Sequence, residues 1–304
     1  MNSLRFFSAA SVLIVAAAAG ARAAPGAPPA DAVAGEPAVL PRATRYDFTS
    51  RINGRSYRVL VAAPFKADPD KFYPVFYVLD GNWYFFAAAE NVTEAGNTIT
   101  PAIVVGVGYP TEDNDAVAYR RALELTPPGG PRGPDAEPTG GGDDFLRVLL
   151  EEVKPLVQAR YQVDVHRQTL YGKSLGGLMV LRLMFRNPGA FQTYVAASPA
   201  IWWNDRVVLA DEAAFARQVR AGALRLRLLI TSAGEEQYRG YNLLRRWREA
   251  QHNRMIDDAS DLAGRLAELN PSTAAVQYVI FPDETHVSVS LVSLGRALNF
   301  ALKP

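Results

Sequence analysis

Apolar and polar residues alternate with a period of two near the start of the main body of the chain. Residues 45–51 and 55–63 form two such runs, and Asn53-Gly54 lies between them. Alternation places every second side chain on one face of a strand, and Asn-Gly favours the tight turn that joins two antiparallel strands. We therefore predict a β-hairpin over these residues.

Further along, short runs are apolar at every position and stop at aspartate or glycine. Tyr73–Leu79 ends at Asp80-Gly81, and residues 102–107 end at Gly108. Continuous apolarity over so few residues is typical of a parallel strand that is buried on both faces. Further strands are predicted over residues 169–171, 194–197, 224–231 and 275–281.

Helical spacing of apolar residues fills the intervals between these strands. Asp143-Asp144 can cap a helix that runs to about Tyr161. Its apolar positions are Phe145, Leu149, Val153 and Leu156. Other helices are predicted over residues 175–185, 241–269 and 287–302. Strands that alternate with helices predict an α/β domain over residues 41–304, with a mostly parallel sheet, an N-terminal hairpin and helices on both faces.

The N-terminal residues have the pattern of an export signal. Arg5 supplies a positive charge, residues 6–20 are apolar, and Ala21-Arg22-Ala23 has the form of a signal-peptidase site. The apolar run is short and rich in alanine for a membrane span, so we interpret residues 1–23 as a signal peptide, with an uncleaved anchor as the alternative. Residues 24–40 are rich in Ala, Pro and Gly and predict a disordered leader. The expected location is the periplasm.

The composition excludes several kinds of site. The chain of 304 residues has 32 basic and 31 acidic residues, three histidines and no cysteine. A near-neutral charge argues against binding to nucleic acid, and the lack of cysteine excludes disulfides, thiolate nucleophiles and cysteine-ligated metals. We expect no cofactor, no metal and no stable membrane insertion once the signal is removed. The expected partner is a small-molecule substrate, and the oligomeric state is left open.

One segment has the composition of a long loop. Between Pro127 and Gly142, eleven of sixteen residues are Gly or Pro. A segment of this length without regular structure, inside a compact domain, is usually a functional loop. We expect it to border the functional site.

Gly172-Lys173-Ser174-Leu175-Gly176 matches the pattern G-x-S-x-G between a predicted strand and a predicted helix. In that context the serine lies on a sharp turn at the end of the sheet and acts as a nucleophile. The backbone N–H of Leu175, at the helix N-terminus, can stabilise an oxyanion. The alternative is a chance serine between glycines.

A serine nucleophile needs a base, and histidine is the usual one. His286 follows the last predicted strand, which is where the base lies in the chain order serine, acid, histidine. His166 is expected at the far end of the nucleophile strand, and His252 lies in a charged, helix-like stretch. We therefore predict that His286 is the base. The alternative is that it is a surface histidine without a catalytic role.

The acid that orients this histidine belongs on a loop between Ser174 and His286. The loop after the strand at 224–231 carries both Glu235 and Glu236, and the residues alone do not decide between them. Asp205 is a more distant candidate.

Several strings resemble the putative-esterase branch of the α/β hydrolases, which includes esterase D-like enzymes and siderophore esterases. They are LDGNWYF, RALELTPP, YGKSLGGLMVLRLMFRNPGAF, ASPAIWWND, AGEEQ and FPDETHVSV, and the resemblance covers roughly residues 44–303. Within this branch the secreted form is most similar to the periplasmic ferric-enterobactin esterases. Members of the family have a glutamate directly before Gln, which points to Glu236. The chain departs from their Gly-Glu-x-Glu-Gln pattern here.

The resemblance also implies the remaining site residues. The backbone N–H of Asn82, in Asp80-Gly81-Asn82, would be the second oxyanion donor beside Leu175, unless this is an ordinary strand-ending turn. Arginines near the site hold the anionic iron–catecholate in such esterases. The candidates for substrate contact are Arg120, Arg121, Trp83, Trp203 and Lys173. Either arginine could instead pair with Asp113, Asp115 or Glu124, and Trp83, Trp202 and Trp203 could be core residues.

We therefore expect a serine esterase that cleaves the trilactone of a ferric catecholate siderophore such as enterobactin. A general carboxylesterase or thioesterase would use the same residues, and so would a secreted acyltransferase. A siderophore-binding protein with a residual triad is the alternative outside enzymes.

Overall fold

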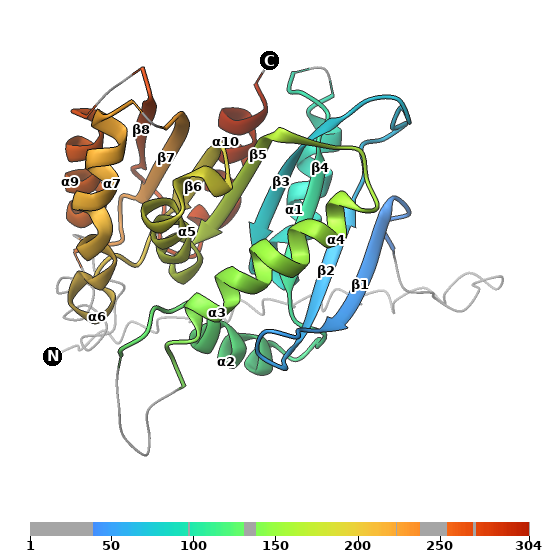
Figure 1. The fold of residues 1–304 in the computed structure, drawn as a ribbon, viewed down its shortest axis with the longest axis horizontal. Coiled ribbons are helices and arrows are strands. Elements are labelled where there is room, and N and C mark those ends of the chain that lie inside the picture. The colour runs from blue at the N-terminus through green and yellow to red at the C-terminus, as the bar shows by residue number, and fades with distance from the viewer. Residues whose placement is uncertain are drawn as a thin grey trace, which may run out of the picture. The chain divides into compact units, whose positions relative to one another are not determined.

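The computed structural model describes residues 39–96, 98–130, 138–222, 224–237, 254–269 and 272–303, and these residues form a single eight-stranded sheet (Figure 1). The predicted signal peptide, almost all of the predicted leader, His252 and the middle of the Gly/Pro-rich loop lie outside the described residues. In the part of the chain that the structure describes, no helix is long and apolar enough to cross a membrane.

The strands follow the order β1-β2-β4-β3-β5-β6-β7-β8 across the sheet. Strand β2 pairs antiparallel with β1 and with β4, and the other neighbours are parallel. The predicted hairpin and the mostly parallel α/β sheet are confirmed. The strands are β1 (Ala43–Thr49), β2 (Ser56–Ala62), β3 (Tyr73–Leu79), β4 (Ile103–Gly108), β5 (Val163–Lys173), β6 (Thr193–Ala197), β7 (Leu226–Ala233) and β8 (Ala274–Phe281).

Helices cover both faces of the sheet (Figure 1). Helices α1 (Gly81–Glu94) and α10 (Val289–Leu302) pack together on one face. The opposite face is covered by α2 (Asn114–Glu124), α3 (Gly142–Arg147), α4 (Lys154–Gln158), α5 (Leu175–Arg186), α7 (Glu212–Arg220) and α9 (Met255–Ala267). Short helical turns are η1 (Val148–Val153, a π-helix), η2 (Pro188–Ala190), α6 (Trp203–Arg206) and η3 (Val207–Asp211).

Strand β3 shows why the central strands have continuous apolar sequences. Phe76 and Val78 are buried under α1 and α10, whereas Tyr77 and Leu79 are buried in the core on the other face. Because successive side chains of a strand point to opposite faces, a strand covered on both sides needs an apolar residue at every position.

Helices α1, α2 and α7 were not predicted from the sequence pattern. Helix α1 begins immediately after β3, and its first residues are aromatic on several sides, so its apolar positions do not form the single stripe of a surface helix. Strand β5 is also longer than the predicted run, because it begins with a polar segment that contains His166. His166 is exposed there, at the end of β5 opposite Ser174, as predicted.

The helix predicted from Asp143-Asp144 differs in its start and its interior. It begins at Gly142 with Gly141 as the N-cap, and a π-helical turn separates α3 from α4. Asp143 does not cap it, because its carboxylate accepts hydrogen bonds of 2.6 and 2.8 Å from the buried guanidinium of Arg182 on α5. The hydrogen bond from Arg182 holds the pKa of Asp143 below its usual value.

We expect Asp143→Ala to lower the free energy of unfolding by roughly 2 kcal/mol, because the charge of Arg182 loses its partner. The loss should be smaller than the roughly 3–5 kcal/mol typical of a fully buried pair, since 42% of the Asp143 side chain is exposed to screening water. Urea unfolding measures the change. Asp144→Ala, at the exposed neighbouring position, is the control and should change stability little. Equal small losses in both variants would show that the Asp143–Arg182 pair does not support the helix packing.

Candidate active site

Three loops that carry the predicted triad meet at one edge of the sheet. Ser174 follows β5, Glu236 follows β7 and His286 follows β8. Strands β5 to β8 are parallel neighbours, so their carboxyl ends point the same way. Open parallel sheets place their functional residues at this edge.

The turn at Ser174 is strained and tightly packed. Ser174 has a φ of +58°, in a region that residues with a side chain rarely adopt. A Cβ atom on Gly172 would come within 2.4 Å of the backbone of Gly176, so no larger residue fits there without a shift of the chain. The Ser174 N–H donates to the Ala197 carbonyl at 2.9 Å, and its own carbonyl accepts from Ala200 at 3.1 Å. These contacts with the end of β6 and the loop that follows hold the turn that the sequence motif predicts.

The structure places His286 against Glu236. Nδ1 of His286 lies 2.5 Å from Oε1 of Glu236, whose side chain is only 1% exposed. The other carboxylate oxygen accepts the Ala233 N–H at 2.9 Å. Of the three acids considered from the sequence, Glu236 is therefore the one in contact with His286, and Asp205 is exposed on the loop after β6.

Backbone hydrogen bonds between the loops after β7 and β8 explain why Glu236, and not Glu235, contacts His286. The Gly234 N–H donates to Phe281 O at 2.7 Å, and the Glu235 N–H donates to Glu284 O at 3.0 Å. The Gly234 position is so close to the carbonyl of Pro282 that a Cβ there would lie 2.2 Å from it. The two loops are thus joined at Glu235, and the next residue carries its carboxylate to His286.

Ser174 and His286 share no hydrogen bond among the contacts of the described residues. Nε2 of His286 remains available, since Nδ1 faces Glu236, and the hydroxyl of Ser174 is half-buried. In structures without substrate, the nucleophile–base hydrogen bond is often long and tightens only when substrate is bound. The arrangement can therefore supply a nucleophile, a base and an acid that orients the base.

The predicted oxyanion donors lie in the first turns of two helices. Asn82 is the second residue of α1, and Leu175 is the first residue of α5. First-turn N–H groups have no acceptor within their own helix and can donate to an anion. The Asn82 side chain fixes its loop, because its amide donates to Tyr109 O at 2.9 Å and accepts from Tyr109 N at 2.8 Å.

Arg121 connects Asp80, directly before α1, with the turn at Ser174. Its guanidinium donates to Asp80 at 2.9 Å and to the carbonyl of Lys173 at 3.1 Å. Asp80 is buried, and burial raises the pKa of its carboxyl, an effect that the charge of Arg121 opposes. The sequence alone does not show this connection. Asp80-Gly81-Asn82 and Lys173-Ser174 are each predicted to lie at the site, but their link through Arg121 depends on where α2 packs.

Arg120, the neighbouring residue on α2, contacts other groups than Arg121 does. It donates to the fully buried Glu124 at 3.0 Å, and its guanidinium lies 5.5 and 4.8 Å from the ring centres of Tyr57 and Tyr109. Of the alternatives considered from the sequence, pairing with Glu124 is the one observed. Arg120 thus helps to hold α2 against β2, and its contact with substrate stays a prediction.

The other candidates for substrate contact differ in how far their side chains are exposed. Trp83 is 39% exposed beside Asn82, and Arg121 lies 5.6 Å from its ring centre. Trp203 packs against the core, and a Cβ on Gly130 would lie 2.9 Å from its ring, so it supports the Gly/Pro-rich loop. Lys173 is only 5% exposed, which leaves little of its amine for a substrate to reach.

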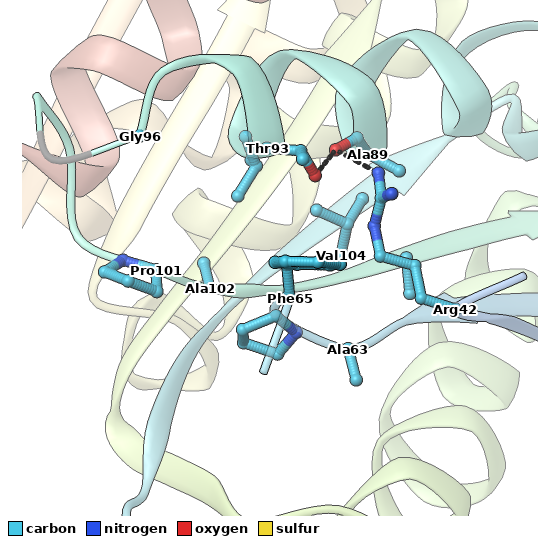
Figure 2. A pocket seen from close by; sticks show the side chains of 12 residues that line it. Arg42, Ala63, Phe65, Ala89, Thr93, Gly96, Pro101, Ala102 and Val104 are labelled. Atoms are coloured by element: carbon cyan, nitrogen blue, oxygen red, sulfur yellow. Dashed lines mark hydrogen bonds between the residues drawn. The ribbon is translucent and has the colours of Figure 1, made fainter. Parts of the chain in front are cut away.

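A cavity of about 260 Å³ lies at the other end of the sheet (Figure 2). It is lined by Ala102 and Val104, at the start of β4, and by the last turns of α1. The guanidinium of Arg42 reaches across it to the carbonyl of Ala89 at 3.1 Å. The cavity is far from the loops that carry the triad. Within the described ranges, no group of three His, Cys, Asp or Glu side chains is placed to hold a metal ion.

Comparison with known proteins identifies the family of the chain. Residues 50–264 match the family described as Putative esterase. The chain is 34% identical to the ferri-bacillibactin esterase BesA of Bacillus subtilis over 266 residues, which span 84% of this chain and 88% of the relative. It is 33% identical to a siderophore enterobactin esterase of Emericella nidulans over 255 residues, 74% of this chain and 80% of the relative. Among solved structures, the BES protein of Bacillus cereus superposes with a TM-score of 0.77 at 31% identity, covering 89% of this chain and 99% of that one.

The match to the family extends over more than two thirds of the chain, and the relatives are matched over most of their length. The fold, with its mostly parallel sheet, is that of the solved BES protein of Bacillus cereus. The protein belongs to the Putative esterase family of α/β hydrolases and is a serine hydrolase acting on ester bonds.

Proposed function

We propose that this protein hydrolyses the trilactone esters of a ferric catecholate siderophore of the enterobactin kind, and so aids the release of iron. The main support for the reaction type is the contact of His286 with Glu236. It lies at the same edge of the sheet as the strained turn of Ser174. The substrate class is supported by the relatives, which are named as esterases of ferri-bacillibactin and enterobactin.

In the proposed reaction Ser174 Oγ attacks the ester carbonyl carbon while Nε2 of His286 takes its proton. Glu236 keeps Nδ1 of the ring protonated and stabilises the imidazolium that forms. The imidazolium then gives its proton to the leaving hydroxyl of the lactone. Water, deprotonated by the same histidine, hydrolyses the acyl-enzyme and regenerates Ser174.

The N–H groups of Asn82 and Leu175 are proposed as donors to the oxyanion of both tetrahedral intermediates. They belong to different helices, so their spacing depends on the contacts that fix each helix start. Asn82 is fixed by its side chain on Tyr109, and Arg121 ties its loop to the residue before Ser174. A donor aimed in this way at developing charge contributes about 3–4 kcal/mol to transition-state stabilisation in other hydrolases.

The placement of Trp83 and Arg121 favours the proposal of an aromatic, anionic substrate. Trp83 exposes part of its indole directly after the proposed oxyanion donor, and the Arg121 guanidinium lies beside that ring. A ferric triscatecholate has flat rings and negative charge, so an exposed indole backed by a cation matches both features.

A panel of ferric siderophores and small neutral aryl esters, analysed by mass spectrometry, tests the proposal. We expect cleavage products of the ferric catecholates, and Ser174→Ala should lower kcat by roughly 10⁶ while the variant still binds its ligand. Cleavage of the small esters alone would indicate a general esterase. Products that form only with an added sugar acceptor would indicate an acyltransferase, and binding without any product would indicate a binding protein.

Glu236→Gln should lower kcat by roughly 10²–10⁴, because an amide cannot stabilise the imidazolium of His286. Glu235→Gln is the matched control, since its backbone N–H makes the loop contact and the substitution leaves that group in place. Steady-state kinetics with one small ester measures both variants. A larger loss in Glu235→Gln than in Glu236→Gln would remove Glu236 from the triad.

Trp83→Ala should raise KM for the ferric catecholate about fivefold, the equivalent of roughly 1 kcal/mol of ring and cation contact. Hydrolysis of a small neutral ester should stay within about twofold of the wild-type rate, since that reaction uses the triad and the oxyanion donors. Phe65→Ala is the control, because Phe65 is an exposed aromatic residue at the far end of the sheet. Equal losses on both substrates would show that Trp83 supports the site structurally rather than binding the siderophore.

A further inference from the structure

A second cavity, of about 220 Å³, lies at the edge of the sheet opposite Ser174. Its lining comes from the first halves of β5, β6 and β7 and from the last residues of α10. Pockets for drug-sized ligands usually have volumes of roughly 300–1,000 Å³, so this cavity suits a smaller molecule. The described residues that line it include no member of the proposed triad.

Three polar residues of the lining are direct neighbours across the sheet. Thr169 on β5 pairs with Thr193 on β6, which in turn pairs with Arg227 on β7. Their side chains lie on the face that α10 covers, because the residues two positions further along each strand are buried in the core beneath that helix. Thr169 is 3% exposed and Thr193 is 6% exposed. The register of the sheet thus places two buried hydroxyls and one guanidinium side by side at the cavity.

Arg227 is a cation without an acidic partner in the part of the chain that the structure describes. Its guanidinium donates to the carbonyl of Phe300 at 2.5 Å and lies 4.4 Å from the centre of the Phe300 ring. Partial burial lowers the pKa of Arg227, and no carboxylate opposes this effect. A guanidinium has five N–H groups, and the bond to Phe300 uses one of them. Donors of Arg227 therefore remain for a ligand.

The other polar side chains of the lining are hydrogen-bond donors as well. Gln192 accepts a backbone N–H of β5 through Oε1 at 3.0 Å, which leaves its NH₂ group for another acceptor. His166 and Lys303 add an imidazole and an ammonium group. Arg167 also lines the cavity, but its charge is paired with Asp164 at 2.6 Å. Among the described residues of the lining there is no aspartate or glutamate.

We propose that this cavity binds a small oxyanion of the phosphate type. Its donors lie on three strands and at the end of α10, and hydroxyl, amide and guanidinium groups all donate well to phosphate oxygens. The charges of Arg227 and Lys303 favour an anion over a cation or a neutral molecule. No Phe, Tyr or Trp is among the described lining residues, so the cavity does not match a catechol ring. The inference is independent of the proposed function, since the triad lies at the other edge of the sheet.

A bound oxyanion would also connect parts of the fold that now meet through few polar contacts. It would join the starts of β6 and β7 to the end of α10, where Arg227 already contacts Phe300. A ligand that binds only the folded state raises stability by mass action. Binding should therefore appear as a gain in melting temperature as well as in a direct titration.

Isothermal titration calorimetry with inorganic phosphate tests the inference, with sodium chloride at matched ionic strength as the reference titration. We expect saturable binding with a Kd on the order of 1 mM, since the ligand is very small. NMR signals of the His166 ring should shift during the same titration, whereas those of His286 should not. Phosphate at about ten times the Kd should raise the melting temperature by about 3 °C.

Two variants of the cavity should each weaken phosphate binding by about tenfold or more, namely Thr193→Val and Arg227→Gln. Thr193→Val keeps every charge and the shape of the side chain, so it tests the site even if Arg227→Gln loosens the end of α10. Arg220→Gln is the matched control, because it removes one positive charge from an exposed position on α7. It should leave the Kd unchanged, and hydrolysis of a small ester should stay the same in all three variants.

Three results would overturn the inference. A lack of saturable binding up to about twenty times the expected Kd would leave Arg227 as a contact for the end of α10 alone. An equal Kd in the wild type, in Thr193→Val and in Arg227→Gln would show that phosphate binds outside the cavity. A shift of the His286 signals without a shift of the His166 signals would assign the phosphate to the site that contains Ser174.

Discussion

The site depends on a serine held at a positive φ between a strand and a helix. Ser174 can adopt this angle because Gly172 lets the chain pass the backbone of Gly176 at a distance that no Cβ allows. Its N–H and carbonyl are also bound by the end of β6 and the loop that follows. A strained residue persists only where its surroundings fix it from several sides. The parallel pairing of β5 with β6 supplies that support, so the geometry of the nucleophile is a property of the sheet as well as of the motif.

Buried charges at the sheet edge give the site its second constraint. Arg121 joins the end of β3 to the end of β5 through Asp80 and the Lys173 carbonyl. Glu236 joins the end of β7 to the loop after β8 through His286. In each contact the carboxylate is buried, and loss of its partner would leave it unpaired at a cost of several kcal/mol. These pairs therefore fix the loops relative to one another, and the oxyanion donors with them.

The sequence predicted the parts of the site that depend on local pattern. The order of strand ends predicts that Ser174 and His286 lie at one edge of the sheet, where the structure has them, because a short apolar run followed by a turn residue marks the end of a parallel strand. The residues alone did not decide between Glu235 and Glu236, and only the family resemblance pointed to Glu236. The choice follows from a hydrogen bond between Glu235 and Glu284, which are far apart in the chain. The same reason separates Arg120 from Arg121: neighbours on one helix point to different partners, and only the placement of α2 shows which partner each meets. Helix α1 escaped prediction because exposed aromatic residues, Trp83 and Phe86, hide its buried stripe in the sequence.

The position of β8 has a consequence for how the site is assembled during folding. Ser174 follows β5, in the middle of the sheet, whereas His286 follows β8, which is an edge strand. An edge strand pairs with one neighbour only, so the central strands can form their hydrogen bonds without it. A sheet that lacks β8 holds the nucleophile turn but has no base to activate the serine. Detachment of this one edge strand would therefore remove esterase activity while most of the sheet stays intact.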